Sequence, residues 1–148
     1  MKPRLPVYVL TAFLLATLCE AAAAEGDYLV YVGSYTDAPS NSKGIYARRF
    51  EPSSGKVTSL GLVAETVNPA YVCATPDGRF LYAVNWQTPE AAKGDTMSAY
   101  SINKNGGALT FLNKVRAGGG LPNQVIVDPQ GKFVMVTNYG FPWDRCRP

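Results

Sequence analysis

The stretch NPAYVCATPDGRFLYAVNW, residues 68–86, returns later in the chain as LPNQVIVDPQGKFVMVTNY, residues 121–139. In each copy, two mostly apolar runs flank a short turn, PDGR in the first and PQGK in the second. Each copy therefore predicts two strands joined by a tight turn. The identical positions are Pro69/Pro122, Val72/Val125, Pro76/Pro129, Gly78/Gly131, Phe80/Phe133 and Asn85/Asn138.

A second pair of similar segments, residues 42–63 and 94–115, precedes these two hairpins. In each segment, apolar and polar residues alternate with a period of two, which is typical of half-buried strands. Each segment also has a glycine-bearing turn in its middle, with Gly55 aligned to Gly107. One repeat therefore comprises four strands in about 52 residues, and the chain is expected to form about nine strands, beginning at residues 28–36. The strands of the second copy are expected at residues 96–103, 108–116, 122–127 and 132–139.

Four short strands in each repeat of this length are typical of a β-propeller blade. A single four-stranded sheet cannot bury both of its faces, whereas blades stacked around an axis cover one another. We expect an all-β chain that forms a partial β-propeller, with a little over two four-stranded blades, while closed propellers have four to eight. Residues 141–148, FPWDRCRP, break the repeat, so we expect a truncated or frameshifted copy of a chain of roughly 350–400 residues.

The first 24 residues have the layout of a secretory signal peptide. Lys2 and Arg4 precede an apolar run at residues 7–18, and Ala22 to Ala24 supply small residues before Glu25. We expect a signal-peptide helix that is cleaved after Ala24, which leaves a secreted or periplasmic protein without a stable membrane anchor. An uncleaved anchor or a buried helix stays open as an alternative. The expected division is thus 1–24 signal peptide, 25–140 incomplete propeller and 141–148 aberrant tail.

Composition excludes several classes of function. The sequence has no histidine, which removes the commonest general base and the commonest metal ligand. The net charge of +3 is not gathered into a basic cluster, so no nucleic-acid partner is expected. No metal site and no cofactor are expected.

The motifs resemble the amino-terminal third of the seven-bladed β-propeller lactonases, the family of the propeller-type 6-phosphogluconolactonase. The resemblance covers residues 28–140, and YVGSYT at residues 31–36, followed by GIY, is its most specific part. It implies a ring of seven blades, hydrolysis of a sugar lactone to the free acid, and a site at the mouth of the central channel. Gln124 stands where the family usually has histidine.

Lactone opening needs an activated water, a stabilised oxyanion and a protonated leaving group, and a phosphorylated substrate also favours Arg or Lys. The substrate-binding candidates are Gln124, Asn138, Asn85 and Arg116. Glu65, before the strand of the first hairpin, is the candidate general base.

Each candidate also has a purely structural interpretation. Gln124 can satisfy loop backbone, and the recurrence of Asn85 as Asn138 favours a structural asparagine that bonds turn backbone. Asp77 and Asp128 are expected to bond the amides of their tight turns. The glycine run at residues 118–120 is expected to connect blades flexibly.

Two functions follow as hypotheses. The first is a sugar-lactone hydrolase, of which the 148-residue product is an inactive fragment because most of the channel wall is absent. The alternative is a non-catalytic secreted propeller that binds carbohydrate or peptide, or serves as a scaffold.

Overall fold

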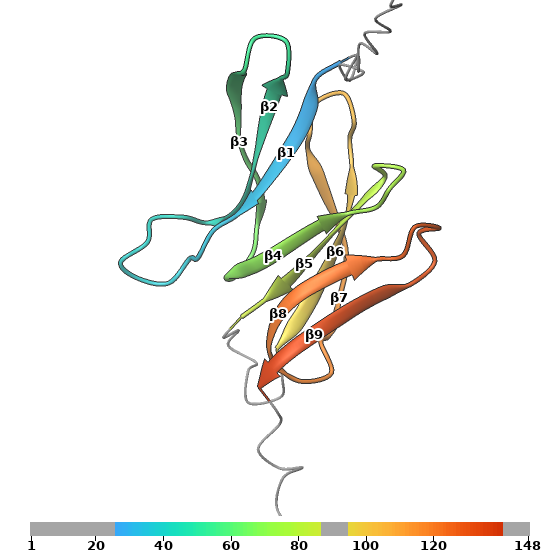
Figure 1. Cartoon of the computed structure of the whole chain (residues 1–148). Coiled ribbons are helices and arrows are strands. Elements are labelled where there is room, and N and C mark those ends of the chain that lie inside the picture. Colours follow the sequence, from blue (N-terminus) through green and yellow to red (C-terminus); the bar gives the residue numbers. More distant parts are fainter. Residues whose placement is uncertain (1–25, 87–94, 141–148) are drawn as a thin grey trace, which may run out of the picture.

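The computed structural model describes residues 26–86 and 95–140, and within them all regular structure is β-strand (Figure 1). The nine strands are β1 (Tyr28–Gly33), β2 (Gly44–Glu51), β3 (Lys56–Glu65), β4 (Pro69–Ala74), β5 (Phe80–Asn85), β6 (Thr96–Ile102), β7 (Leu109–Arg116), β8 (Gly120–Val127) and β9 (Val134–Gly140). This confirms the predicted all-β partial propeller and the strands that the alternation indicated.

The strands form three antiparallel sheets, each built from neighbours in sequence. The first sheet has the order β1-β2-β3, the second β4-β5-β6-β7 and the third β8-β9. The second sheet, residues 69–116, is thus the one complete four-stranded sheet of the described part. The four strands predicted between residues 96 and 139 all form, but the first two complete the second sheet and the last two begin the third.

The sheets stack in chain order, with β4 lying between β1 and β8 (Figure 1). Between the first two sheets lies a core of Ile45, Leu81, Ala83 and Tyr100, each at most 3% exposed. Burial of one large apolar side chain contributes about 2 kcal/mol, so this cluster stabilises the contact between the first two sheets. Val125 of β8 is fully buried and belongs to the contact of the third sheet with the second.

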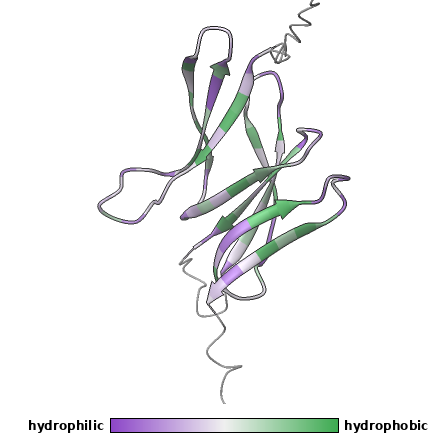
Figure 2. Ribbon diagram, in the orientation of Figure 1, coloured by the Kyte–Doolittle hydropathy of each residue, from purple (hydrophilic) through white to green (hydrophobic). Residues whose placement is uncertain are grey.

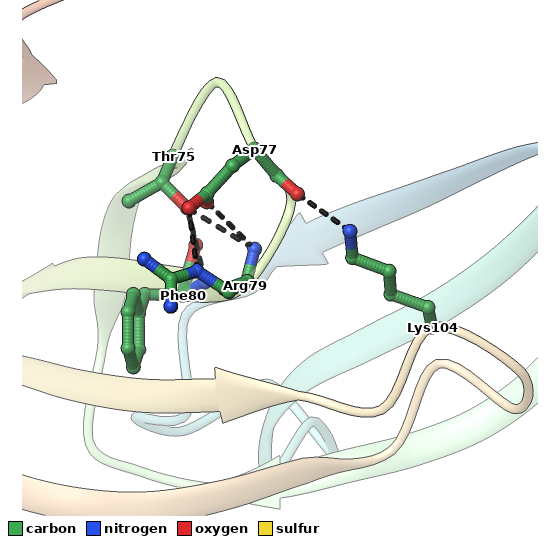
Figure 3. A network of polar contacts seen from close by, with 5 residues as sticks. All are labelled: Thr75, Asp77, Arg79, Phe80 and Lys104. Atoms are coloured by element: carbon green, nitrogen blue, oxygen red, sulfur yellow. Dashed lines mark hydrogen bonds and ion pairs between the residues drawn. The ribbon is translucent and has the colours of Figure 1, made fainter. Parts of the chain in front are cut away.

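At the edge where β4 leads into β5, side-chain hydrogen bonds hold the hairpin turn (Figure 3). Asp77 accepts hydrogen bonds from the Thr75 hydroxyl at 2.6 Å and the Arg79 amide at 3.0 Å, and it pairs with Arg79 Nε at 2.6 Å. Lys104, from the turn between β6 and β7, donates to the Asp77 carbonyl at 2.7 Å and ties the two turns together. The hydrogen bond from Thr75, followed by those from Arg79, lowers the pKa of Asp77 well below its usual range.

The equivalent turn of the third sheet is held by Asp128, which occupies the position of Thr75 in the first turn. Its carboxylate accepts from the Phe133 amide at 2.6 Å and the Gln130 amide at 3.2 Å. The hydrogen bond from Phe133 is the main cause that lowers the pKa of Asp128. The prediction that both aspartates bond turn amides is confirmed.

Within residues 26–86 and 95–140 there is no helix of the length and apolar character that a bilayer span requires. The predicted signal peptide at 1–24 and the predicted tail at 141–148 lie outside the described residues.

The Asp77→Asn variant tests the acid dependence of the first turn. The folded-state pKa of Asp77 lies below that of the unfolded chain, so its stabilisation is complete above about pH 4 and is lost as the pH falls further. Urea unfolding should therefore show a clear loss of stability in the variant at pH 7 and a smaller difference at pH 3. A difference that stays the same or grows on acidification would contradict this account.

Candidate functional site

In each of the three sheets, the odd-numbered strands end and the even-numbered strands begin on the same side, where the linkers connect them; we call this side the linker rim (Figure 1). It comprises residues 34–43, 66–68 and 117–119 together with the adjoining strand ends. The opposite edge carries the hairpin turns. A small hollow there, between residues 75–80 and 129–131, is lined by turn residues whose carboxylate is already paired with Arg79.

At the linker rim, the residue before each recurring proline adopts a left-handed backbone. Asn68 has φ of 38° and Leu121 has φ of 53°, and they precede Pro69 and Pro122. Asparagine tolerates this conformation, whereas for a bulky side chain such as leucine it is strained. The two residues occupy the same place in the two copies.

Asn68 is fully buried and satisfies every polar group of its side chain. Its Oδ1 accepts from the Thr36 amide at 2.7 Å and the Thr36 hydroxyl at 3.1 Å, and its Nδ2 donates to Asp37 at 2.7 Å. Its carbonyl accepts the Trp86 amide at 3.0 Å. Asn68 therefore joins the loop after β1 to the ends of β4 and β5.

Asn85, the last residue of β5, is 1% exposed and bound on all sides. Its Nδ2 donates to the Thr66 hydroxyl at 2.8 Å and the Val67 carbonyl at 2.7 Å, and its Oδ1 accepts from Ser98 at 2.8 Å. No group of this side chain is left for a ligand. The Asn85 amide donates to the linker between β3 and β4. From the sequence, we expected it to bond the backbone of its own turn instead.

Asn138 repeats this arrangement in the third sheet with less burial. Its Nδ2 donates to the Ala117 carbonyl at 3.1 Å, and the residue is exposed. A Cβ added to Gly119 would come within 2.8 Å of the Asn138 side chain. The glycine run thus includes a position fixed by a close approach, and Gly120 already pairs with Gly140 as part of β8.

Asp95 lies at the seam of the second and third sheets with 4% exposure. Its Oδ2 accepts the amide of left-handed Leu121 at 2.8 Å, and its carbonyl accepts the Ala117 amide at 2.9 Å. Asp95 Oδ1 and the neighbouring Thr96 hydroxyl are buried without a hydrogen-bond partner in the described part of the chain. Unsatisfied buried polar atoms are rare in proteins. Here one of them, Asp95 Oδ1, lies close to Leu121, whose backbone is strained, at the rim end of the contact between the second and third sheets.

Two aromatic residues follow strands at the rim, Tyr35 after β1 and Trp86 after β5. Trp86 donates its indole N–H to the Pro122 carbonyl at 2.6 Å, which ties β5 to the start of β8. Tyr35 meets Trp86 edge to face, with ring centroids 5.9 Å apart. Burial, and to a lesser degree Asp37, raises the pKa of Tyr35, so its hydroxyl stays protonated at neutral pH.

The remaining candidates from the sequence are exposed but dispersed. Gln124 lies on β8, beside Thr137, on the face that points away from the second sheet. Glu65 and Arg116 end β3 and β7, the outer strands of their sheets. In residues 26–86 and 95–140, no hydrogen bond or ion pair joins any two of the five candidates.

Two carboxylates at the rim were not singled out from the sequence, Asp37 and Asp95. Sequence alone gave no signal for them, because their partners come from linkers and loops distant along the chain. The described ranges hold no group of three or more His, Cys, Asp or Glu side chains arranged to bind a metal ion. The described part of the rim thus presents neutral donors, the exposed cations Lys43 and Arg116, and scattered carboxylates.

Residues 29–141 match the family model described as lactonase, 7-bladed beta-propeller. The chain belongs to this family. It is 37% identical over 113 residues to a 6-phosphogluconolactonase of Bacillus subtilis, and 31% identical over 113 residues to a 6-phosphogluconolactonase of Formosa agariphila. Each match covers 76% of this chain.

Among solved structures, the periplasmic gluconolactonase of Pseudomonas aeruginosa superposes with a TM-score of 0.65 at 30% identity, covering 78% of this chain and 32% of that one. The chain spans about a third of the length of its relatives, 30% of the Bacillus protein and 31% of the Formosa protein.

Asn85 and Asn138 occupy the same position in the two repeats but differ in burial, so the two residues test how much burial contributes to stability. Asn85→Ala leaves the Val67 carbonyl and the Ser98 hydroxyl unsatisfied in a buried place, and is expected to cost about 2–3 kcal/mol of unfolding free energy. Asn138→Ala, at the equivalent exposed position, should cost less than about 1 kcal/mol. Chemical denaturation of both variants measures the difference, and equal losses would refute the assignment of Asn85 to the buried frame.

Proposed function

We propose that the protein to which this chain contributes is a sugar-lactone hydrolase of the 6-phosphogluconolactonase type. The observation that carries the proposal is the 37% identity with the Bacillus subtilis 6-phosphogluconolactonase across nearly the whole family match. In this reaction, water adds to the acyl carbon of the lactone, the ring C–O bond breaks, and a carboxylic acid and a hydroxyl group result. The substrate class is therefore a cyclic sugar ester.

The described residues offer some of the groups that this reaction needs. Gln124, exposed in the middle of β8, can donate its amide to the carbonyl oxygen on which negative charge develops. Arg116, exposed at the end of β7, suits an anionic substituent such as phosphate. Glu65 is the proposed general base, and Asn138 presents a partly engaged amide to substrate hydroxyls.

The frame under these side chains supports the same proposal. The Trp86 indole holds the start of β8 through Pro122, and Asp95 holds Leu121 two residues before Asn123. A donor such as Gln124 contributes to catalysis only if its strand is held in place before the substrate arrives. We therefore place Asn85, Asn68 and Asp95 in the support of the site, outside direct contact with substrate.

A non-catalytic propeller is the second candidate. One observation favours it: the sequence has no histidine, and Gln124 occupies the place where the family usually has one. An amide can donate and accept hydrogen bonds but cannot take a proton at neutral pH. Such a protein would bind a sugar lactone, or another carbohydrate, without turnover.

The test transfers residues 29–141 into the Bacillus subtilis relative in place of the matching segment. The chimera should hydrolyse 6-phosphogluconolactone, and Gln124→Ala in it should lower kcat about 100-fold, because an oxyanion donor is lost. Gln130→Ala, at the exposed turn on the opposite edge, is the matched control and should leave kcat unchanged. The 148-residue chain by itself should show no rate above buffer.

A folded chimera that binds the lactone without hydrolysing it would instead establish the binding module. A chimera in which Gln124→Ala and Gln130→Ala behave alike would remove Gln124 from the site.

We also propose that the protein is exported. The support is the signal-peptide pattern of residues 1–24, together with the periplasmic gluconolactonase of Pseudomonas aeruginosa among the related structures. Export would bring the site to lactones outside the cytoplasm.

Protein recovered from the extracytoplasmic fraction should begin at Glu25, as measured by intact mass. Leu14→Arg, which interrupts the apolar run, should keep the full-length chain inside the cell. A soluble product that begins at Met1 in the wild type would contradict the export proposal.

A further inference from the structure

The strand β8 carries a β-bulge close to the linker rim. Its burial does not alternate there, since Asn123 and Gln124 are both exposed after the buried Pro122. Pro122 pairs with Asn138 of β9 whereas Gln124 pairs with Thr137, which leaves Asn123 as an additional residue in the strand. Figure 2 shows the result as a hydrophilic stretch near the start of β8, followed by apolar residues.

The position of this bulge determines whether Gln124 faces outward. Pro122 and Val125 are both buried, and side chains alternate between the faces of a regular strand, so one of the two residues between them faces inward unless the bulge lies where it does. The Thr137 hydroxyl donates to Asn123 Oδ1 at 2.7 Å. Among the described residues, no hydrogen bond engages the Gln124 side chain, which therefore stays available to a ligand.

The second sheet holds the start of β8 through groups at the ends of β5 and β6. The buried Asp95, just before β6, accepts the Leu121 amide at 2.8 Å through its Oδ2 and the Ala117 amide at 2.9 Å through its carbonyl. Trp86, just after β5, donates its indole N–H to the Pro122 carbonyl at 2.6 Å. The residues on the rim side of the bulge are thus fixed to the second sheet before β8 pairs with β9.

Leu121 depends on this support more than its counterpart Asn68 does. Both have left-handed backbone, with φ of 53° and 38°, which asparagine tolerates and leucine does not. The amide of each donates to a side-chain oxygen of the preceding sheet or its loop, Asn68 to the Thr36 hydroxyl at 3.2 Å and Leu121 to Asp95 at 2.8 Å. A carboxylate is the stronger acceptor of the two, so the more strained residue has the stronger partner.

We propose that Asp95 is a positioning residue of the site, which fixes the bulge of β8 through the Leu121 amide and so keeps Gln124 facing outward. This inference rests on the proposed function, in which Gln124 donates to the developing oxyanion. Without the Asp95 carboxylate, Leu121 returns to an extended backbone and the bulge loses its single position. Because Gln124 acts on charge that develops in the transition state, the loss falls on kcat and spares KM.

The test uses the chimera that carries residues 29–141 in the Bacillus subtilis relative, with 6-phosphogluconolactone as substrate. Asp95→Ala should lower kcat about 10- to 100-fold and change KM less than about 2-fold, because the donor is displaced from the oxyanion. Asp95→Asn retains an oxygen that accepts the Leu121 amide and should keep kcat within about 3-fold of the wild type. Leu121→Asn, added to Asp95→Ala, should restore most of the lost kcat, because asparagine adopts the left-handed backbone unaided.

Amide hydrogen exchange of residues 119–125 gives a readout that needs no turnover. Exchange should be faster in Asp95→Ala and should return to the wild-type rate when Leu121→Asn is added. Asp128→Ala is the matched control, since it removes a carboxylate that binds backbone amides at the other end of β8. The control should lower stability but leave kcat, KM and this exchange unchanged.

The two readouts separate this inference from the proposed function. A folded chimera that does not hydrolyse the lactone contradicts the function, while hydrogen exchange still measures the effect of Asp95. Wild-type kcat and exchange in Asp95→Ala, an equal fall of kcat in Asp128→Ala, or no recovery with Leu121→Asn would each overturn the role of Asp95. If Asp95→Ala alone does not fold, Leu121→Asn should restore folding, and a double variant that also fails to fold overturns the proposal.

Discussion

Each sheet in this chain has two apolar faces, and no sheet of two to four strands can cover both by itself. The second sheet resolves this by contact with a neighbour on either side, through Leu81 and Ala83 towards the first and Val84 towards the third. Within residues 26–86 and 95–140, the first and third sheets each have one neighbouring sheet. The stacking order of the sheets and the buried core follow from this requirement.

The linker rim is where the stacked sheets are tied together by polar groups. Asn85 donates to the linker between β3 and β4, and Asn68 bonds the loop after β1. The Trp86 indole donates to the Pro122 carbonyl of the third sheet. The strain at Leu121 is held by the buried carboxylate of Asp95. Rigidity of this kind suits an edge that has to present side chains to a ligand, and the membership in a lactonase family agrees with that use.

The strands, their turns and the family could be predicted from the sequence, because alternation, the PDGR and PQGK turns and the repeated positions are local signals. The roles of Asn85 and Asp95 could not. A buried asparagine and an exposed one share the same letter at the same repeat position, and only the contact of Asn85 with Val67 and Ser98 separates them. Likewise, Glu65 and Arg116 end outer strands, and the order of strands in a sheet is a tertiary property.

The two linkers differ in length: three residues lie between Glu65 and Pro69, but five lie between Arg116 and Pro122. The two additional residues lie before Pro122, and Pro122 still pairs with Asn138 as Pro69 pairs with Asn85. A gene that grows by copying this unit can therefore gain or lose codons at the crossing between blades without shifting any strand against its partner. A change in linker length at these crossings can therefore alter the linker rim while the pairing of the strands stays the same.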